Sequence, residues 1–345
     1  MFLKTLEELA QVWRGEVIES RHLGVAVVAN AAGEVIAGWG DPDLVTYPRS
    51  SMKPFQALAL VETGAADAFA LSSRHLALAC ASHRGEAHHT DLAADWLETI
   101  GCAVPDLACG PEYPKHPETQ RRMLRAGEEA TSLHHNCSGK HTGFLTVCRH
   151  CGYGIEDYAA VDHPAQQYFF ELLADLGAPV GMPVGSDGCT LPSPALRLGD
   201  AARLGARFAA GQAPAKRAAA MARLIDAMGR HPEYTSGSEH AMVAVAEATG
   251  RRVVFKGGAE AFLLAFLPQD GLAIALKVAD GNARARVPAL IAILHRLRLI
   301  GDAEVAALAA FARPAITNSR AEQVGRIEPA AFETEAPRGA ALRRA

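Results

Sequence analysis

Residues 24–39 contain two β-rich runs, Gly24-Val25-Ala26-Val27-Val28-Ala29 and Glu34-Val35-Ile36-Ala37-Gly38-Trp39, separated by Asn30-Ala31-Ala32-Gly33. Runs rich in β-branched residues on either side of a short loop with glycine are typical of a β-hairpin. Three further apolar runs near the other end of the chain are expected to be strands, over residues 252–256, 261–267 and 272–279. The chain therefore supplies strands from both of its ends.

The middle of the chain, from about residue 70 to 250, is rich in alanine and leucine and is expected to be helical. The predicted helices are Asp91–Ile100, His141–Cys151, Pro164–Leu176, Pro214–Met228 and Glu239–Thr249. Residues 55–64 are expected to form one helix that glycine ends, and an amphipathic helix is expected over 284–298.

This order of strands, helices, strands and helix predicts an α/β protein of the α+β kind. Its mainly antiparallel sheet would be built from both chain ends, about residues 15–50 and 250–330, beside a helical lobe over about 51–249. Together these form one bilobal domain over residues 1–334, followed by a solvated tail over 335–345.

The composition is that of an ordinary globular protein, with 49% hydrophobic residues and 21% charged residues in a chain of 345. A net charge of −4 argues against a nucleic-acid binder. The chain has no uncharged apolar run whose length approaches the roughly 20 residues of a membrane-spanning helix. The first eight residues include an acidic pair and do not resemble a signal peptide, so we expect a cytoplasmic protein whose seven cysteines are thiols or metal ligands.

Ser50-Ser51-Met52-Lys53-Pro54 places a serine and a lysine three residues apart, where an extended segment is expected to turn into a helix. Positions i and i+3 of a helix share a face, so the Lys53 amine can approach the Ser50 hydroxyl. A neutral lysine amine can accept the proton of a serine and make it a nucleophile. Alone, the spacing is more often a helix cap followed by a solvated lysine.

Two more segments carry the same residue types. Ser82 lies in a polar turn after the apolar run 76–80, where a serine ordinarily caps the next helix. Lys256 follows Val-Val-Phe and precedes Gly257-Gly258, so it ends a strand that is expected to be buried. A lysine there needs partners, although its side chain can also extend to solvent from the strand end.

Two cysteines lie in turns beside glycine, in Asn136-Cys137-Ser138-Gly139-Lys140-His141 and in Gly185-Ser186-Asp187-Gly188-Cys189. Two thiolates with other donors are able to bind zinc, but two separate buried thiols are the more common case. Cys148-Arg149-His150-Cys151 lacks a second Cys-x-x-Cys, and we expect no metal site there. The adjacent pairs His88-His89 and His134-His135 are expected at the surface or in loops.

Five motifs in this order resemble the rhizobial-type, thermolabile L-asparaginases, and the resemblance extends from the first hairpin to about residue 328. The motifs are Tyr47-Pro48-Arg49-Ser50-Ser51-Met52-Lys53-Pro54, Cys80-Ala81-Ser82-His83, Asn136-Cys137-Ser138-Gly139-Lys140-His141, Gly185-Ser186-Asp187-Gly188-Cys189 and Phe255-Lys256-Gly257-Gly258-Ala259-Glu260.

The resemblance implies a fold like that of serine β-lactamases and glutaminases, and hydrolysis of L-asparagine to L-aspartate and ammonia by a homodimer. It assigns catalysis to two serine–lysine pairs, Ser50 with Lys53 and Ser82 with Lys256. It assigns Zn²⁺, assisting substrate binding, to Cys137, Lys140 and Cys189. It places Arg49, His141 and Asp187 at the substrate.

Two alternatives stay open from the sequence. One is another amidohydrolase on the same fold, such as a glutaminase or a penicillin-recognising enzyme. The other is a non-enzymatic binding protein stabilised by zinc.

Overall fold

The computed structural model describes residues 6–332, which form two compact units. Among the described residues, the sheet unit contains those up to Pro48, Leu196–Ala210 and those from Glu247 onward. The helical unit contains Arg49–Ala195 and Gly211–Ala246. Leu196–Ala210 thus belongs with the sheet, although it lies inside the range expected for the helical lobe. The expected tail, 335–345, lies outside the described residues.

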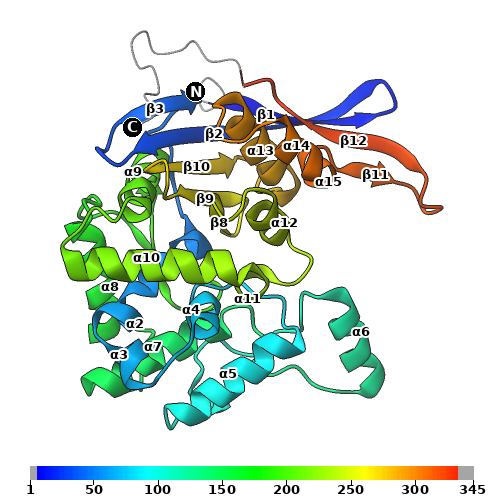
Figure 1. Cartoon of the computed structure of the whole chain (residues 1–345). Helices are drawn as coiled ribbons and strands as arrows, with labels where there is room; N and C mark the ends of the chain where they lie inside the picture. Colours follow the sequence, from blue (N-terminus) through cyan, green and yellow to red (C-terminus); the bar gives the residue numbers. More distant parts are fainter. Residues whose placement is uncertain (1–5, 333–345) are drawn as a thin grey trace. The chain divides into compact units, whose positions relative to one another are not determined.

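The sheet has eight strands in the order β11-β12-β1-β2-β10-β9-β8, with β3 pairing with β2. All of its pairings are antiparallel. Strands from the beginning of the chain, blue in Figure 1, lie beside yellow and orange strands from its end. The strands are β1 (Glu7–Arg14), β2 (Val17–Asn30), β3 (Val35–Trp39), β8 (Val254–Gly257), β9 (Phe262–Leu267), β10 (Leu272–Val278), β11 (Ala315–Thr317) and β12 (Gln323–Pro329).

The expected hairpin is present as β2 and β3, which pair with Ala26 opposite Trp39. Strands β9 and β10 are buried along their whole length, which explains why their sequences are continuously apolar instead of alternating. Strand β1 is absent from our predictions because its sequence, EELAQVWR, has neither a clear alternation nor an apolar run. It forms because β2 and β12 pair with its two edges.

Helices α9 and α13 pack against the central strands of this sheet. The sheet unit also contains a short strand pair, β4 (Val45–Thr46) with β7 (Leu196–Arg197). The helices of this unit are α9 (Leu198–Ala209), the 3₁₀ helix η4 (Ala283–Ala285), α13 (Arg286–Arg296), α14 (Asp302–Ala307) and α15 (Ala309–Ala312). Helix α12 (Ala241–Ala248) spans the boundary between the units.

The helical unit is built around α7, in which every residue from Ser138 to Cys148 is buried. Helices α2, α3, α4, α5 and α8 pack against it. The helices of this unit are α1 (Lys53–Gln56), α2 (Leu58–Glu62), α3 (Ala65–Ala68), α4 (Ser73–Ala79), α5 (Ala87–Thr99), α6 (Pro117–Ala126), α7 (Ser138–Cys151), α8 (Pro164–Asp175), α10 (Ala215–Arg230) and α11 (Pro232–Ser236), with 3₁₀ helices η2 (Arg49–Met52) and η3 (Val104–Asp106). A two-stranded ribbon joins β5 (Val184–Ser186) to β6 (Pro192–Pro194).

The fold class predicted from the sequence, helices with a mainly antiparallel sheet built from both chain ends, is confirmed. All five helices predicted within residues 91–249 exist, with ends shifted by a few residues. The helix expected over 55–64 is interrupted at Ala57, which separates α1 from α2.

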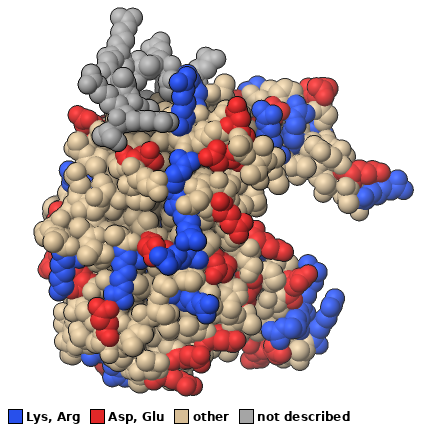
Figure 2. Space-filling view, viewed as in Figure 1, with Lys and Arg blue, Asp and Glu red and all other residues tan. Residues whose placement is uncertain are grey.

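Within residues 6–332, no helix combines the length and the apolar character that crossing a membrane requires. On the face shown in Figure 2, basic and acidic side chains are interspersed.

Candidate active site

Lys53 begins α1, directly after the 3₁₀ helix that contains Ser50. Pro54 follows in the first turn, where a missing N–H costs little because no helical partner exists for it. The Lys53 side chain is completely buried, and its Nζ donates hydrogen bonds to the Ala81 carbonyl and, at 3.0 Å, to Ser82 Oγ. A buried amine is thus held against a serine hydroxyl.

Ser82 lies just beyond α4, and its backbone N–H donates to the Thr235 carbonyl of α11 at 3.0 Å. The lysine that contacts it comes from 29 residues earlier in the chain, so local spacing did not indicate this pair. Ser50 is half-buried in η2, three residues before Lys53. The pairing of Ser50 with Lys53 stays a prediction.

Lys256 lies in β8 of the sheet unit, is 3% exposed, and donates from Nζ to the Gly257 carbonyl at 2.7 Å. It is therefore a buried strand lysine, as its surroundings in the sequence indicate. Its partnership with Ser82 of the helical unit stays a prediction.

Cys137, Lys140 and Cys189 come together in the interior of the helical unit. Their exposures are 3%, 3% and 2%, and Lys140 Nζ lies 2.9 Å from Cys189 Sγ. A hydrogen bond from Cys189 lowers the pKa of the Cys137 thiol well below its ordinary value, although burial opposes this. The same hydrogen bond raises the pKa of Cys189. Burial lowers the pKa of Lys140, but the two sulfurs and Asp187 outweigh it and raise the pKa.

These three side chains fit a zinc ion by their chemistry. Two sulfurs and a nitrogen are donors that zinc prefers, and they already form a contiguous buried group. The Lys140 amine holds its proton strongly in this arrangement, so a metal ion must displace that proton before it can bind nitrogen.

Arg49 and Asp187 form an ion pair, with Arg49 Nε 2.7 Å from Asp187 Oδ1. Arg49 has φ +53°, a left-handed conformation that costs a non-glycine residue about 1–2 kcal/mol. Asp187 lies in the turn after β5, where it also accepts from the Gly188 N–H. Two of the three residues expected at the substrate therefore contact each other.

His141, the third of these residues, is completely buried next to Lys140 in α7. Its Nδ1 lies 2.6 Å from the Tyr158 hydroxyl, and its Nε2 has no hydrogen-bond partner among the described residues. Burial, and then repulsion by Lys140, lower its pKa well below the ordinary value. The ring is thus neutral and retains one unused nitrogen.

Sequence reasoning missed the role of His83, which connects the Ser82 segment to α7. His83 is buried, and its Nε2 lies 2.8 Å from Ser138 Oγ, next to Cys137. Its position directly after Ser82 in the motif was the available signal. The expectation that the adjacent histidines lie at the surface or in loops is wrong for His89, which is 0% exposed in α5, whereas His135 lies in a loop but is only 8% exposed.

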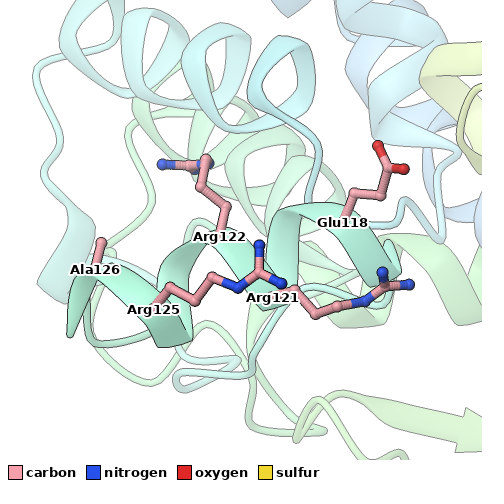
Figure 3. A pocket seen from close by; sticks show the side chains of 5 residues that line it. All are labelled: Glu118, Arg121, Arg122, Arg125 and Ala126. Carbon is pink, nitrogen blue, oxygen red and sulfur yellow. The ribbon is translucent and has the colours of Figure 1, made fainter.

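A surface hollow of about 560 Å³ lies elsewhere in the helical unit, along α6. Figure 3 shows that the side chains around it come from this one helix. They are Glu118, Arg121, Arg122, Arg125 and Ala126. None belongs to the residues predicted for catalysis or metal binding.

The features so far define an α+β protein with a lysine–serine contact and a cysteine–lysine cluster buried in its helical unit. The chain belongs to the L-asparaginase II family, whose model matches residues 10–329. This confirms the resemblance to asparaginases. No curated protein matches the chain significantly.

Solved structures of similar proteins include a β-lactamase from Mycobacterium bovis, at 17% identity over 84% of this chain and 95% of that one, with a TM-score of 0.39. They also include Mglu in its glutamate form, at 17% identity over 80% of this chain, with a TM-score of 0.37. This chain spans 60% of the length of that Mglu chain.

Proposed function

We propose that this protein is an L-asparaginase that hydrolyses L-asparagine to L-aspartate and ammonia. The observation that supports it most directly is the 3.0 Å contact between the buried Lys53 Nζ and Ser82 Oγ, in a chain of the L-asparaginase II family. A lysine in contact with a serine hydroxyl supplies the base that amide hydrolysis by a serine requires.

In the proposed mechanism Ser50 attacks the side-chain amide carbon of asparagine while the neutral amine of Lys53 accepts its proton. Backbone N–H groups at the start of the helix stabilise the oxyanion of the tetrahedral intermediate. Ammonia leaves with a proton, and water then cleaves the aspartyl ester. Ser82, which is hydrogen bonded to Lys53, would relay that proton together with Lys256 as the second base.

Ser82 is a second candidate for the nucleophile, because the Lys53 contact favours it. In that case Lys53 activates Ser82 directly, and Ser50 takes the supporting role. The same acyl transfer follows, with the ester on the other serine.

Arg49 and Asp187 carry the opposite charges that the α-carboxylate and α-amino group of asparagine need. We propose that this pair and His141 orient the substrate. Cys137, Lys140 and Cys189 would hold a zinc ion. When bound, it would supply a positive charge that assists substrate binding.

We further propose that the two units work as one catalytic domain, and that the protein is a cytoplasmic homodimer. Light scattering coupled to size-exclusion chromatography measures the dimer directly. A monomer at the concentrations used for assays would contradict it.

The decisive experiment traps the acyl-enzyme with a slowly hydrolysed asparagine analogue and locates the modified serine by peptide mass. We expect the label on Ser50, and near-complete loss of ammonia release in Ser50→Ala with unchanged stability. Ser51→Ala, at the adjacent buried serine, is the matched control and should retain activity. A label on Ser82, with Ser50→Ala activity within about tenfold of wild type, makes Ser82 the nucleophile.

Substrate assays separate the remaining alternatives. Ammonia release from glutamine in preference to asparagine indicates a glutaminase, and hydrolysis of a β-lactam indicates a penicillin-recognising enzyme. A protein that releases no ammonia from either amide, and that unfolds when metal is removed, is a zinc-stabilised binding protein.

A further inference from the structure

Glu86, His88 and His89 form a compact group at the start of α5. Each offers one ligand atom, and these atoms all lie within 4.8 Å of one another. Glu86 precedes the helix and the two histidines lie in its first turn. All three belong to the helical unit, and none takes part in the proposed hydrolysis.

The hydrogen bonds of His89 determine which of its nitrogens is available. Its Nε2 lies 2.9 Å from the Glu233 carbonyl oxygen, which only accepts, so Nε2 carries the proton. Nδ1 therefore has a lone pair, and it is buried without a partner among the described residues. The side chain is 0% exposed, so no bulk water compensates this nitrogen. A backbone carbonyl that fixes the tautomer is the usual support of a metal-binding histidine.

His88 and Glu86 complete the donor set. His88 Nε2 is also buried without a partner within the described residues, and its ring lies 3.9 Å from that of His89 between centroids. The Glu86 carboxylate is held by the Ser238 N–H at 3.1 Å and by Ser238 Oγ at 2.7 Å. Each carboxylate oxygen keeps a further lone pair for a ligand.

We propose that Glu86, His88 Nε2 and His89 Nδ1 bind a divalent first-row transition metal ion, such as Zn²⁺, at a site separate from Cys137, Lys140 and Cys189. Two imidazoles and a carboxylate are a donor set that suits Zn²⁺ and related ions. Bonds of about 2.1 Å place ligand atoms at most about 4.2 Å apart across an ion. One nitrogen of each histidine and one Glu86 oxygen already lie within 4.8 Å of one another, close to this limit.

This site bears on Ser82 through α11. The Glu233 carbonyl holds His89, and two residues later the Thr235 carbonyl holds the Ser82 N–H. The ring of His83, next to Ser82, stacks on His89 at 4.8 Å. An ion bound here stabilises the segment that positions Ser82. The functional importance of this effect rests on the proposed function, whereas the metal site itself does not.

The test measures metal binding by the full-length protein, independently of activity. In a Cys137→Ser/Cys189→Ser background, the chelator-stripped protein is titrated with Co²⁺, and its stoichiometry and visible spectrum are recorded. We expect one equivalent, with d–d bands but no sulfur-to-cobalt charge transfer. His88→Ala and Glu86→Gln should each weaken binding at least about tenfold, and His295→Ala, at an exposed histidine of α13, should not.

If the double cysteine variant fails to fold, the titration is made with the wild type, which should bind two equivalents of Co²⁺. The single variant His88→Ala should then bind one equivalent. Absence of stoichiometric Co²⁺ from the folded double variant overturns the proposal. Binding that His88→Ala and Glu86→Gln leave unchanged also overturns it. If the protein binds the ion but releases no ammonia, the metal-site proposal stands and the proposed function is wrong.

Discussion

Buried lysines are the most unusual residues of this chain, since lysine is almost never fully buried without partners. Lys53, Lys140, Lys256 and Lys277 are all at most 9% exposed. Lys277 shows the structural solution, because its Nζ donates to the Glu260 and Val278 carbonyls and contacts no residue of the proposed site. Burial alone therefore does not identify a catalytic lysine. The serine hydroxyl beside Lys53 is what distinguishes it.

Replacing Cys137 by serine tests the role of the sulfur cluster. Serine is not ionised at neutral pH, so Cys137→Ser removes the thiolate that Cys189 and Lys140 stabilise. We expect the KM for asparagine to rise at least about tenfold while kcat is largely retained. Steady-state ammonia release measures both constants.

Cys151→Ser, at a partly exposed cysteine in the last turn of α7, is the control and should leave both constants unchanged. If Cys137→Ser lowers kcat without changing KM, the cluster acts in the chemical step, and its assignment to substrate binding is wrong.

At the scale of elements, the close contact between α4 and α7 determines where the site residues lie. A Cβ on Gly139 would lie 2.5 Å from the carbonyl oxygen of Leu78 and 2.5 Å from the side-chain Cγ of Leu78. Glycine is thus required in the first turn of α7, between Ser138 and Lys140. The contact holds Lys140 of the cluster beside the end of α4, which leads to Ser82.

Gly139→Ala should lower the free energy of unfolding by about 1–3 kcal/mol, because backbone atoms of α4 cannot move aside cheaply. Chemical denaturation followed by circular dichroism measures the change.

Gly143→Ala in the same buried helix is the matched control. There the nearest atoms to a Cβ lie at 3.7–3.8 Å, an ordinary contact, and alanine should be neutral or stabilising by up to about 1 kcal/mol. Equal stabilities of the two variants would show that α4 and α7 do not meet as described.

At the scale of the whole molecule, the chain places its candidate residues in both units. Ser50, Lys53 and Ser82 belong to the helical unit, and Lys256 belongs to the sheet unit. The proposed mechanism therefore needs Lys256 from the sheet unit in addition to the residues of the helical unit.

Lys256→Met tests this requirement. If Lys256 acts as the second base, kcat for asparagine should fall at least about 100-fold. The thermal stability of Lys256→Met should fall no more than that of the control variant, Lys277→Met. Lys277→Met, at the other buried strand lysine, should retain activity. Full activity of Lys256→Met would show that Lys256 has only a structural role, like Lys277.

The sequence predicted the class of fold because local patterns carry that information. The apolar runs that became β2, β9 and β10 and the alanine-rich segment that became α10 were recognisable from composition and periodicity. Strand β1 was not, because its conformation depends on the edges of β2 and β12 rather than on its own residues. The five motifs also predicted the family, since a motif order is a property of the sequence alone.

Only the tertiary structure decided which side chains contact each other. Lys53 reaches Ser82 across 29 residues, and Lys140 reaches Cys189 across 49; such contacts follow from helix packing, which local spacing does not encode. Packing also buries His89 within α5, although we expected it at the surface or in a loop. The sequence determined which chemical groups this protein has, and packing determined which of them act together.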